Sequence, residues 1–182
     1  MEITVHGVTT PLEGREKKVG GEAPAAKVKT LEGVDHVIGM IAPDTQLLIA
    51  IPSLKTEVCS LGAKKFNELL KDVKKLKTIM VTTDPEDFLK EYVDKEGIEN
   101  ADIVMDSYGE FGKKFGLTIS EGKLKGRLAR ACFVVDKEGM ITYMEVVPEI
   151  VDEINYDACM EAVLACVNKK QKGHAHENWM RV

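Results

Sequence analysis

A chain of 182 residues, of which 44% are hydrophobic, has the length and composition of one domain with a continuous hydrophobic core. Its formal net charge is −5, and no block of Lys and Arg is backed by aromatic residues, which argues against nucleic acid as a partner. No apolar stretch approaches the ~20 residues that span a bilayer, and residues 1–6 lack the basic start and apolar core of a signal peptide, so we expect no membrane partner and a cytoplasmic location.

The N-terminal part of the sequence predicts a β-hairpin region. Residues 3–6 and 26–31 are short segments of alternating polarity, and they lie around turns that contain proline and glycine. We therefore expect an N-terminal hairpin within residues 2–32.

A strand followed by a helix forms the centre of the predicted fold. Residues 47–51 are a continuous apolar run bounded by breakers, which is typical of a strand buried on both faces, and Pro52 ends it. Apolar residues then recur at helical spacing over residues 58–73, and Thr56 stands where an N-cap hydroxyl accepts a hydrogen bond from a free backbone N–H. Cys59 therefore falls in the first helical turn.

The next two elements repeat this order of strand and helix. Residues 78–82 are a β-branched run suited to a second buried strand. The helix after it can be capped by Thr83 or Asp84, Pro85 fits its first position, and Gly97 is a natural stop.

A third strand is predicted at residues 102–105, and a short helix at residues 109–115 is closed by Gly116. The order β-α-β-α-β implies a partly parallel sheet with helices on its faces. Residues 117–129 have the composition of a polar loop, which leads into a strand at residues 131–135.

The C-terminal part predicts a hairpin and a last helix. Residues 136–139 turn the preceding strand back into a strand at 140–147, and residues 155–168 form the last helix. No repeat or linker interrupts the pattern, so we expect one α/β domain over residues 1–168, followed by a polar tail over residues 169–182.

The four cysteines form neither a C-x-x-C pair nor a zinc-ligand pattern; they are Cys59, Cys132, Cys159 and Cys166. A few cysteines without a disulfide framework fit a reducing compartment, where a cysteine in a reactive setting is usually redox-active. The tail contains His174 and His176, which could bind a metal with another ligand, but a histidine pair in a charged tail is more often solvated. We therefore expect no metal and no cofactor.

Cys59 is the expected chemical centre. Only the thiolate is a nucleophile, and a thiol with an ordinary pKa of ~8.5 is only about 3% ionised at pH 7. The free N–H groups and partial positive charge of a helix N-terminus stabilise the anion, and a neighbouring cation adds to this effect. Lys55 is offset by Glu57, so an arginine from elsewhere in the chain is needed. The alternative is a buried, inert cysteine at a helix start.

These residues resemble a known family. The pattern P-x-x-x-T-x-x-C that ends at Cys59 is the active-site pattern of the peroxiredoxins, and P-S-x-x-T-x-V-C followed by residues 65–67 (K-F-N) is similar to their thiol peroxidase branch. A second block, residues 121–131, is similar to the segment that supplies the active-site arginine of that branch, here Arg130. The resemblance covers residues 2–167 and implies a thioredoxin-like fold, with a central mixed β-sheet, flanking helices and an N-terminal hairpin.

The same resemblance assigns roles to four residues. Cys59 attacks a peroxide oxygen and becomes a sulfenic acid, with release of an alcohol or water. The Thr56 hydroxyl and the Cys59 backbone N–H hold the peroxide, and Pro52 shields the pocket from water. Arg130 stabilises the thiolate and the transition state. Two simpler explanations compete with these roles, namely a surface salt bridge for Arg130 and an N-cap alone for Thr56.

The sequence departs from the family where a resolving cysteine is expected. In the thiol peroxidase branch this cysteine usually lies in the helix after the second strand, where this chain has Val93 and no cysteine. Cys132 is better explained by core packing, and Cys159 and Cys166 share an apolar helix face. Each of the three stays a candidate. Our first choice is an external thiol, which makes the protein a one-cysteine peroxidase.

The leading hypothesis is a thiol peroxidase for antioxidant defence, which reduces hydrogen peroxide and small organic hydroperoxides. Thioredoxin or a small thiol is the expected reductant, and the resemblance also implies a homodimer. The alternative is a redox sensor or thiol-dependent binding module that oxidises at Cys59 with little turnover. A non-redox interaction domain is disfavoured because the full set of four site residues is present.

Overall fold

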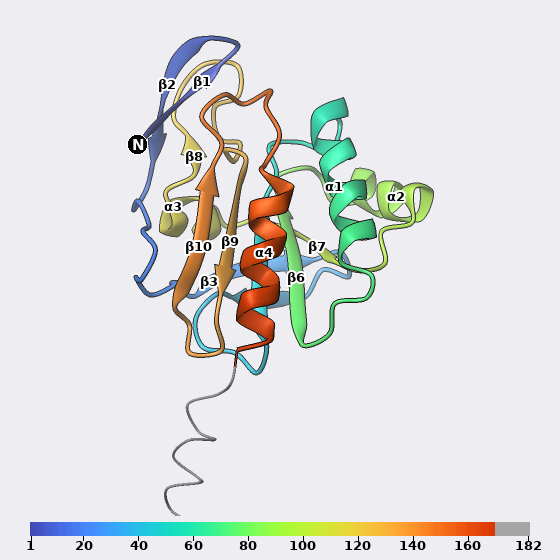
Figure 1. The fold of residues 1–182 in the computed structure, drawn as a ribbon. Helices are drawn as coiled ribbons and strands as arrows, with labels where there is room; N and C mark the ends of the chain where they lie inside the picture. The colour runs from blue at the N-terminus through green and yellow to red at the C-terminus, as the bar shows by residue number, and fades with distance from the viewer. Residues whose placement is uncertain (170–182) are drawn as a thin grey trace, which may run out of the picture.

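The computed structural model of the protein describes residues 1–169, and Figure 1 shows a central sheet with helices packed against it. The sheet has seven strands, which are, in order across it, β10 (Ile141–Val146), β9 (Ala131–Val135), β5 (Thr45–Ala50), β6 (Leu76–Thr82), β7 (Asp102–Met105), β3 (Ala26–Thr30) and β4 (Asp35–Ile38). Strands β5, β6 and β7 are parallel, and all other neighbours are antiparallel. This arrangement confirms the predicted mixed sheet.

The N-terminal hairpin is present but narrower than the sequence predicts. It pairs β1 (Glu2–Val5) with β2 (Val8–Glu13) through a two-residue turn, and β8 (Thr118–Ile119) completes a small second sheet. Both turn residues, His6 and Gly7, have positive φ, which is the geometry that matches the twist of a tight hairpin. The placement of residues 26–31 in this hairpin region is wrong, because β3 pairs instead with β4 and β7 in the main sheet.

Four helices accompany the sheets in the described part of the chain: α1 (Glu57–Leu69), α2 (Glu86–Glu96), α3 (Glu110–Phe115) and α4 (Tyr156–Val167). The helices α1, α2 and α4 share one hydrophobic cluster with the sheet, whereas α3 contributes to the cluster on the other face. Strand β5 lies between the two clusters, since Leu47 and Ile49 belong to the first and Leu48 and Ala50 to the second. Burial of this strand on both faces is therefore confirmed.

The helix ends test the predicted caps. Thr56 is the N-cap of α1, and Gly97 and Gly116 end α2 and α3 in the left-handed conformation, as predicted. The prediction for the start of α2 is wrong, because Pro85 occupies the N-cap position and no side chain caps this helix. The carboxylate of Asp84 accepts hydrogen bonds from the neighbouring loop instead.

The remaining predicted elements differ only at their ends. Strand β9 has its predicted bounds, whereas β10 and α4 are each two residues shorter than expected, one at either end. Strand β8 lies within the segment predicted as a loop, where it is only two residues long. Within residues 1–169, no helix is long and apolar enough to cross a membrane. His174 and His176 lie outside the described residues.

Candidate active site

Cys59 lies in the first turn of α1, at the end of the sheet where β5 finishes. Its backbone N–H donates a hydrogen bond of 3.4 Å to the Thr56 hydroxyl, which itself donates to the Ser53 carbonyl at 2.9 Å. The cysteine is only 2% exposed, and Pro52 is buried immediately before the loop that leads into the helix. The turn therefore holds the sulfur at a fixed position beneath the surface.

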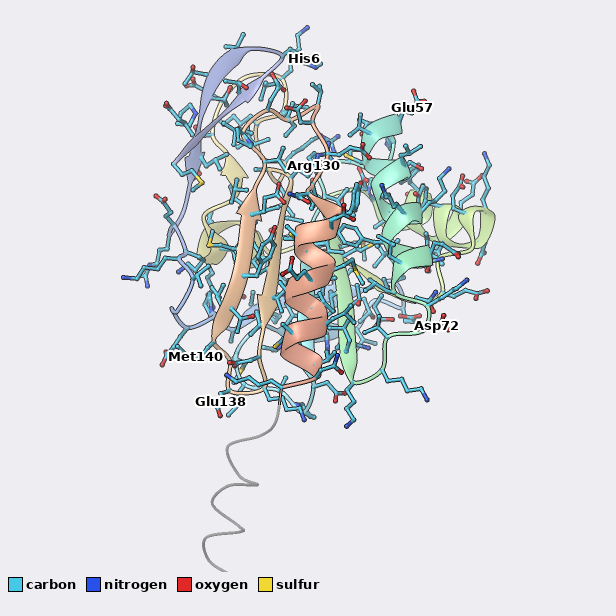
Figure 2. The ribbon with its side chains drawn as sticks, in the orientation of Figure 1. His6, Glu57, Asp72, Arg130, Glu138 and Met140 are labelled. Carbon is cyan, nitrogen blue, oxygen red and sulfur yellow. The ribbon has the colours of Figure 1, made fainter. Side chains whose placement is uncertain are left out.

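Arg130 reaches the same point from a different part of the chain. The register of β5 and β9 pairs Ala50 with Ala131, so the residue before β9 lies beside the end of β5. Nη1 of Arg130 donates to Sγ of Cys59 at 3.2 Å, and Nη2 donates to the Ile150 carbonyl at 2.7 Å. Figure 2 shows Arg130 and the start of α1, where Glu57 is labelled, at the same end of the molecule. The structure thus brings together the four residues predicted from the sequence.

The buried charge of Arg130 has no carboxylate partner among the residues that the structure describes. The residue is 7% exposed, and none of the ion pairs within residues 1–169 includes it. A guanidinium keeps its charge in proteins, and a buried charge is costly unless an opposite charge lies close to it. The anion that can compensate it here is the Cys59 thiolate. The competing explanation of Arg130 as a surface salt bridge is therefore wrong.

One of the three side-chain nitrogens of Arg130 is unpaired among the described residues. Its buried Nε–H has no hydrogen-bond partner among residues 1–169. Buried polar groups are nearly always paired, so an unpaired donor next to a reactive sulfur is an arrangement that suits an incoming oxygen atom.

A small apolar hollow adjoins the sulfur. Its volume is about 10 Å³, roughly the room for one water molecule. It is lined by Ile49, Ala50, Ile51, Cys59, Gly62, Ala63, Phe66, Arg130, Ile154 and Tyr156. Burial raises the pKa of the Tyr156 phenol, so this lining side chain stays neutral and places no second negative charge beside Arg130. Gly62 allows the close approach of the tyrosine, since an added Cβ would lie 2.9 Å from the Tyr156 oxygen.

The other three cysteines pack in or against the same hydrophobic cluster as Cys59. Cys132 and Cys159 are fully buried, and hydrogen bonding to Cys159 together with burial raises the pKa of the Cys132 thiol. Cys166 is partly exposed, with its sulfur 3.4 Å from the Thr45 hydroxyl. All four cysteines are free thiols in this structure, as core packing predicts for Cys132 and Cys159.

Val93 lies on α2, which packs next to α1. The Tyr92 hydroxyl and the Ser60 hydroxyl are 2.9 Å apart, which ties the middle of α2 to the first turns of α1. Val93 is partly buried against the same cluster that contains Cys59. The position where the family places its resolving cysteine therefore lies on a helix in contact with the one that carries the reactive sulfur.

Sequence reasoning missed several residues around the site. Tyr156 and Ile154 line the hollow, while Asp84 and Arg127 bind the loop before α1. Only Asp84 had a recognisable signal, an acidic residue before a proline, and that signal indicated a helix cap. Among residues 1–169 no three His, Cys, Asp or Glu side chains are grouped so that they could hold a metal ion.

The sequence of the chain is similar to those of known proteins. The Redoxin family matches residues 18–160. A thiol peroxidase from Aquifex aeolicus is 37% identical over 161 residues, which is 88% of this chain and 95% of that protein. A thiol peroxidase from Campylobacter jejuni is 36% identical over 151 residues, covering 82% and 85% of the two chains.

Solved structures give the same result for the fold. A crystal structure of a peroxiredoxin-like protein from Aquifex aeolicus has a TM-score of 0.88 at 36% identity, with coverage of 91% of this chain and 97% of that one. A thiol peroxidase from Chromobacterium violaceum has a TM-score of 0.80 at 19% identity, with coverage of 88% and 94%.

The mixed sheet with helices packed against it is a thioredoxin-like fold, and the chain shares this fold with the solved structures. The chain belongs to the Redoxin family, and within it to the peroxiredoxins of the thiol peroxidase branch.

Proposed function

We propose that the protein is a thiol peroxidase that reduces hydrogen peroxide and small organic hydroperoxides through Cys59. The observation that carries this proposal is the 3.2 Å contact between the Cys59 sulfur and a guanidinium nitrogen of Arg130, both buried. The names of the full-length relatives support turnover of peroxide rather than a sensor with little turnover.

The proposed first step is an in-line displacement on oxygen. The Cys59 thiolate attacks one peroxide oxygen, so that an S–O bond forms while the O–O bond breaks, and the sulfur becomes a sulfenic acid. The leaving oxygen takes a proton and departs as water or an alcohol. Arg130 stabilises the negative charge as it moves from sulfur to the leaving oxygen, with its unpaired Nε–H available as an additional donor. Thr56 and the Cys59 N–H hold the substrate, and Pro52 excludes water.

The second half of the cycle needs a thiol. We propose that thioredoxin or a small thiol attacks the sulfenic acid, which releases water and forms a mixed disulfide, and that a second thiol then frees Cys59. Cys132 and Cys159 are fully buried in the core, and the raised pKa of Cys132 disfavours its thiolate, which supports an external reductant.

We further propose a cytoplasmic location and a homodimer. Free cysteines without a disulfide framework support a reducing compartment for the described part of the chain. The homodimer rests on the family resemblance, and multi-angle light scattering across a concentration series tests it.

Steady-state peroxide consumption tests the proposed activity directly. Consumption is expected with dithiothreitol and with thioredoxin, and mass spectrometry after one equivalent of peroxide is expected to show one oxygen added at Cys59. A chain that accumulates the sulfenic acid but does not turn over with either reductant would be a sensor instead.

Replacing Val93 with cysteine should convert the one-cysteine cycle into a two-cysteine cycle. The new thiol lies on a helix in contact with α1, so we expect an intrasubunit disulfide with Cys59 in near-stoichiometric yield after one equivalent of peroxide. Sulfinic acid formation under excess peroxide should fall, and turnover with thioredoxin should rise. Non-reducing peptide mapping by mass spectrometry measures the disulfide and the sulfinic acid together.

Val73→Cys is the matched control for this experiment. Val73 is also partly buried against the same cluster, but it follows the C-terminal end of the 13-residue helix that begins beside Cys59. A helix of that length spans about 20 Å, so the control thiol is too distant to pair. The one-cysteine assignment fails if wild-type protein already forms a stoichiometric disulfide from Cys59 to Cys132, Cys159 or Cys166.

A further inference from the structure

Asp84 is a buried carboxylate that binds the loop leading to Cys59. It follows strand β6, is 2% exposed, and makes no capping hydrogen bond to the helix that it precedes. Oδ1 accepts a hydrogen bond from the Ser53 hydroxyl at 2.8 Å, and Oδ2 accepts one from the Leu54 backbone N–H at 2.7 Å. Helix α2, which begins just after Asp84, has no side-chain cap. The two hydrogen bonds therefore hold the neighbouring loop and do not cap α2.

Arg127 joins a third segment to the same loop. Its Nη1 donates to Oδ1 of Asp84 at 3.3 Å and to the Pro52 carbonyl at 3.3 Å. The Asp84 side chain is fully buried in this pair while that of Arg127 is 36% exposed, so the arginine supplies a counter-charge from the surface. Three stretches that are far apart in sequence are therefore fixed to one another directly before α1.

A continuous series of hydrogen bonds leads from Asp84 to the reactive residue. Asp84 holds the Ser53 hydroxyl, the Ser53 carbonyl accepts from the Thr56 hydroxyl, and that hydroxyl accepts from the Cys59 N–H. Thr56 and the Cys59 N–H are the groups proposed to hold the peroxide. Any rotation of the loop at Ser53 would move both of these groups relative to the sulfur.

We propose that Asp84 and Arg127 are positioning residues for the peroxide. They hold the loop from Pro52 to Thr56 so that the peroxide-binding donors keep their place relative to the Cys59 sulfur. This inference rests on the proposed function. Neither residue touches the sulfur, so both act through the loop and not on the thiolate.

Asp84→Asn should lower the second-order rate constant for peroxide by about 10- to 100-fold, because a displacement of about 1 Å at a reacting centre can cost that much. An asparagine keeps the shape but replaces one acceptor oxygen with an NH₂ group and removes the negative charge, so it cannot accept from the Ser53 hydroxyl, the Leu54 N–H and Arg127 all at once. Alkylation of Cys59 by iodoacetamide needs only the thiolate and no bound peroxide. Its rate in the variant should stay at or above that of wild type.

Asp106→Asn is the matched control. Asp106 is also buried, and it also accepts two hydrogen bonds, from the backbone N–H groups of Phe111 and Gly112 at 2.9 Å each. These bonds lie at α3, and Asp106 does not line the hollow beside Cys59. The control therefore reports the effect of damaging a buried carboxylate elsewhere in the fold, and its peroxide rate should stay within a factor of two of wild type.

Stopped-flow oxidation and iodoacetamide trapping are measured side by side, at a temperature where each variant is folded by circular dichroism. Arg127→Met should lower the peroxide rate by a smaller factor than Asp84→Asn, and Arg127→Lys should recover part of the loss. These Arg127 variants carry the test if Asp84→Asn does not fold.

The proposal is overturned if the peroxide rates of all these variants stay within twofold of wild type, or if alkylation slows by the same factor as peroxide reduction. A wild-type chain that consumes no peroxide would instead refute the proposed function.

Discussion

Replacing Cys59 with serine should reduce peroxide consumption to the background of a reaction without protein. A serine hydroxyl at this site stays protonated near pH 7 and is a far weaker nucleophile than a thiolate. The buried arginine would then lose its contact with the sulfur, but the packing around the side chain changes by a single atom. We therefore expect the fold to stay intact, with a loss in the free energy of unfolding of no more than about 2 kcal/mol.

The measurement is single-turnover oxidation by one equivalent of peroxide, followed by thermal unfolding of the same samples. Cys166→Ser is the matched control, because it makes the same substitution at a cysteine that is partly exposed and away from the arginine. Replacement of Cys132, Cys159 and Cys166 together should leave the first oxidation step nearly unchanged. A serine variant at Cys59 with the wild-type single-turnover rate would remove this cysteine from the mechanism.

The local part of the site was predictable because its signals are local. An apolar run, a proline and a threonine three residues before the cysteine specify a buried strand, a chain turn and a capped helix. The observed N-cap at Thr56 and the burial of Cys59 follow from that order. The positions of the three parallel strands were predictable for the same reason, since each is an apolar run followed by residues that end a strand.

The approach of Arg130 to the sulfur was not available from local patterns. It depends on the antiparallel pairing of β5 with β9, strands that are about eighty residues apart, and no periodicity in either strand specifies its neighbour. Only the resemblance of residues 121–131 to a family segment pointed to this arginine. The structure supplies the physical reason, because pairing Ala50 with Ala131 places the preceding residue beside the end of β5.

Two errors in the sequence predictions have a common cause. Asp84 precedes a proline and a helix, which is the local signature of an N-cap, yet its carboxylate binds Leu54 and Ser53 on another loop. Residues 26–30 alternate like a strand of the N-terminal hairpin region, yet they lie in the main sheet between β4 and the distant strand β7. In both cases a partner distant in sequence satisfies the polar groups better than the local alternative, and a single sequence does not show that partner.

Arg130→Lys should lower the second-order rate constant for peroxide by roughly 30- to 1000-fold, which corresponds to about 2 to 4 kcal/mol of transition-state stabilisation. The planar guanidinium directs Nη1 at the sulfur and Nη2 at the Ile150 carbonyl, and it still has Nε–H unpaired in the pocket. An ammonium group is one compact charge on a flexible stem, and it cannot hold these three directions at once. Because lysine retains the positive charge, the loss in the rate constant measures the contribution of the fixed guanidinium geometry.

The hydrogen bond to the Ile150 carbonyl also stabilises the fold, so Arg130→Lys should lower the free energy of unfolding by about 1 to 3 kcal/mol. The rates are therefore compared at a temperature where both proteins are folded. Arg15→Lys serves as the control, because it makes the same substitution at an exposed arginine and should change neither the rate nor the melting temperature. Stopped-flow oxidation over a range of peroxide concentrations gives the rate constant. The observed rate should rise far less steeply with peroxide concentration for Arg130→Lys than for wild type. A slope within a factor of two of wild type would mean that the buried guanidinium stabilises the fold without taking part in the reaction.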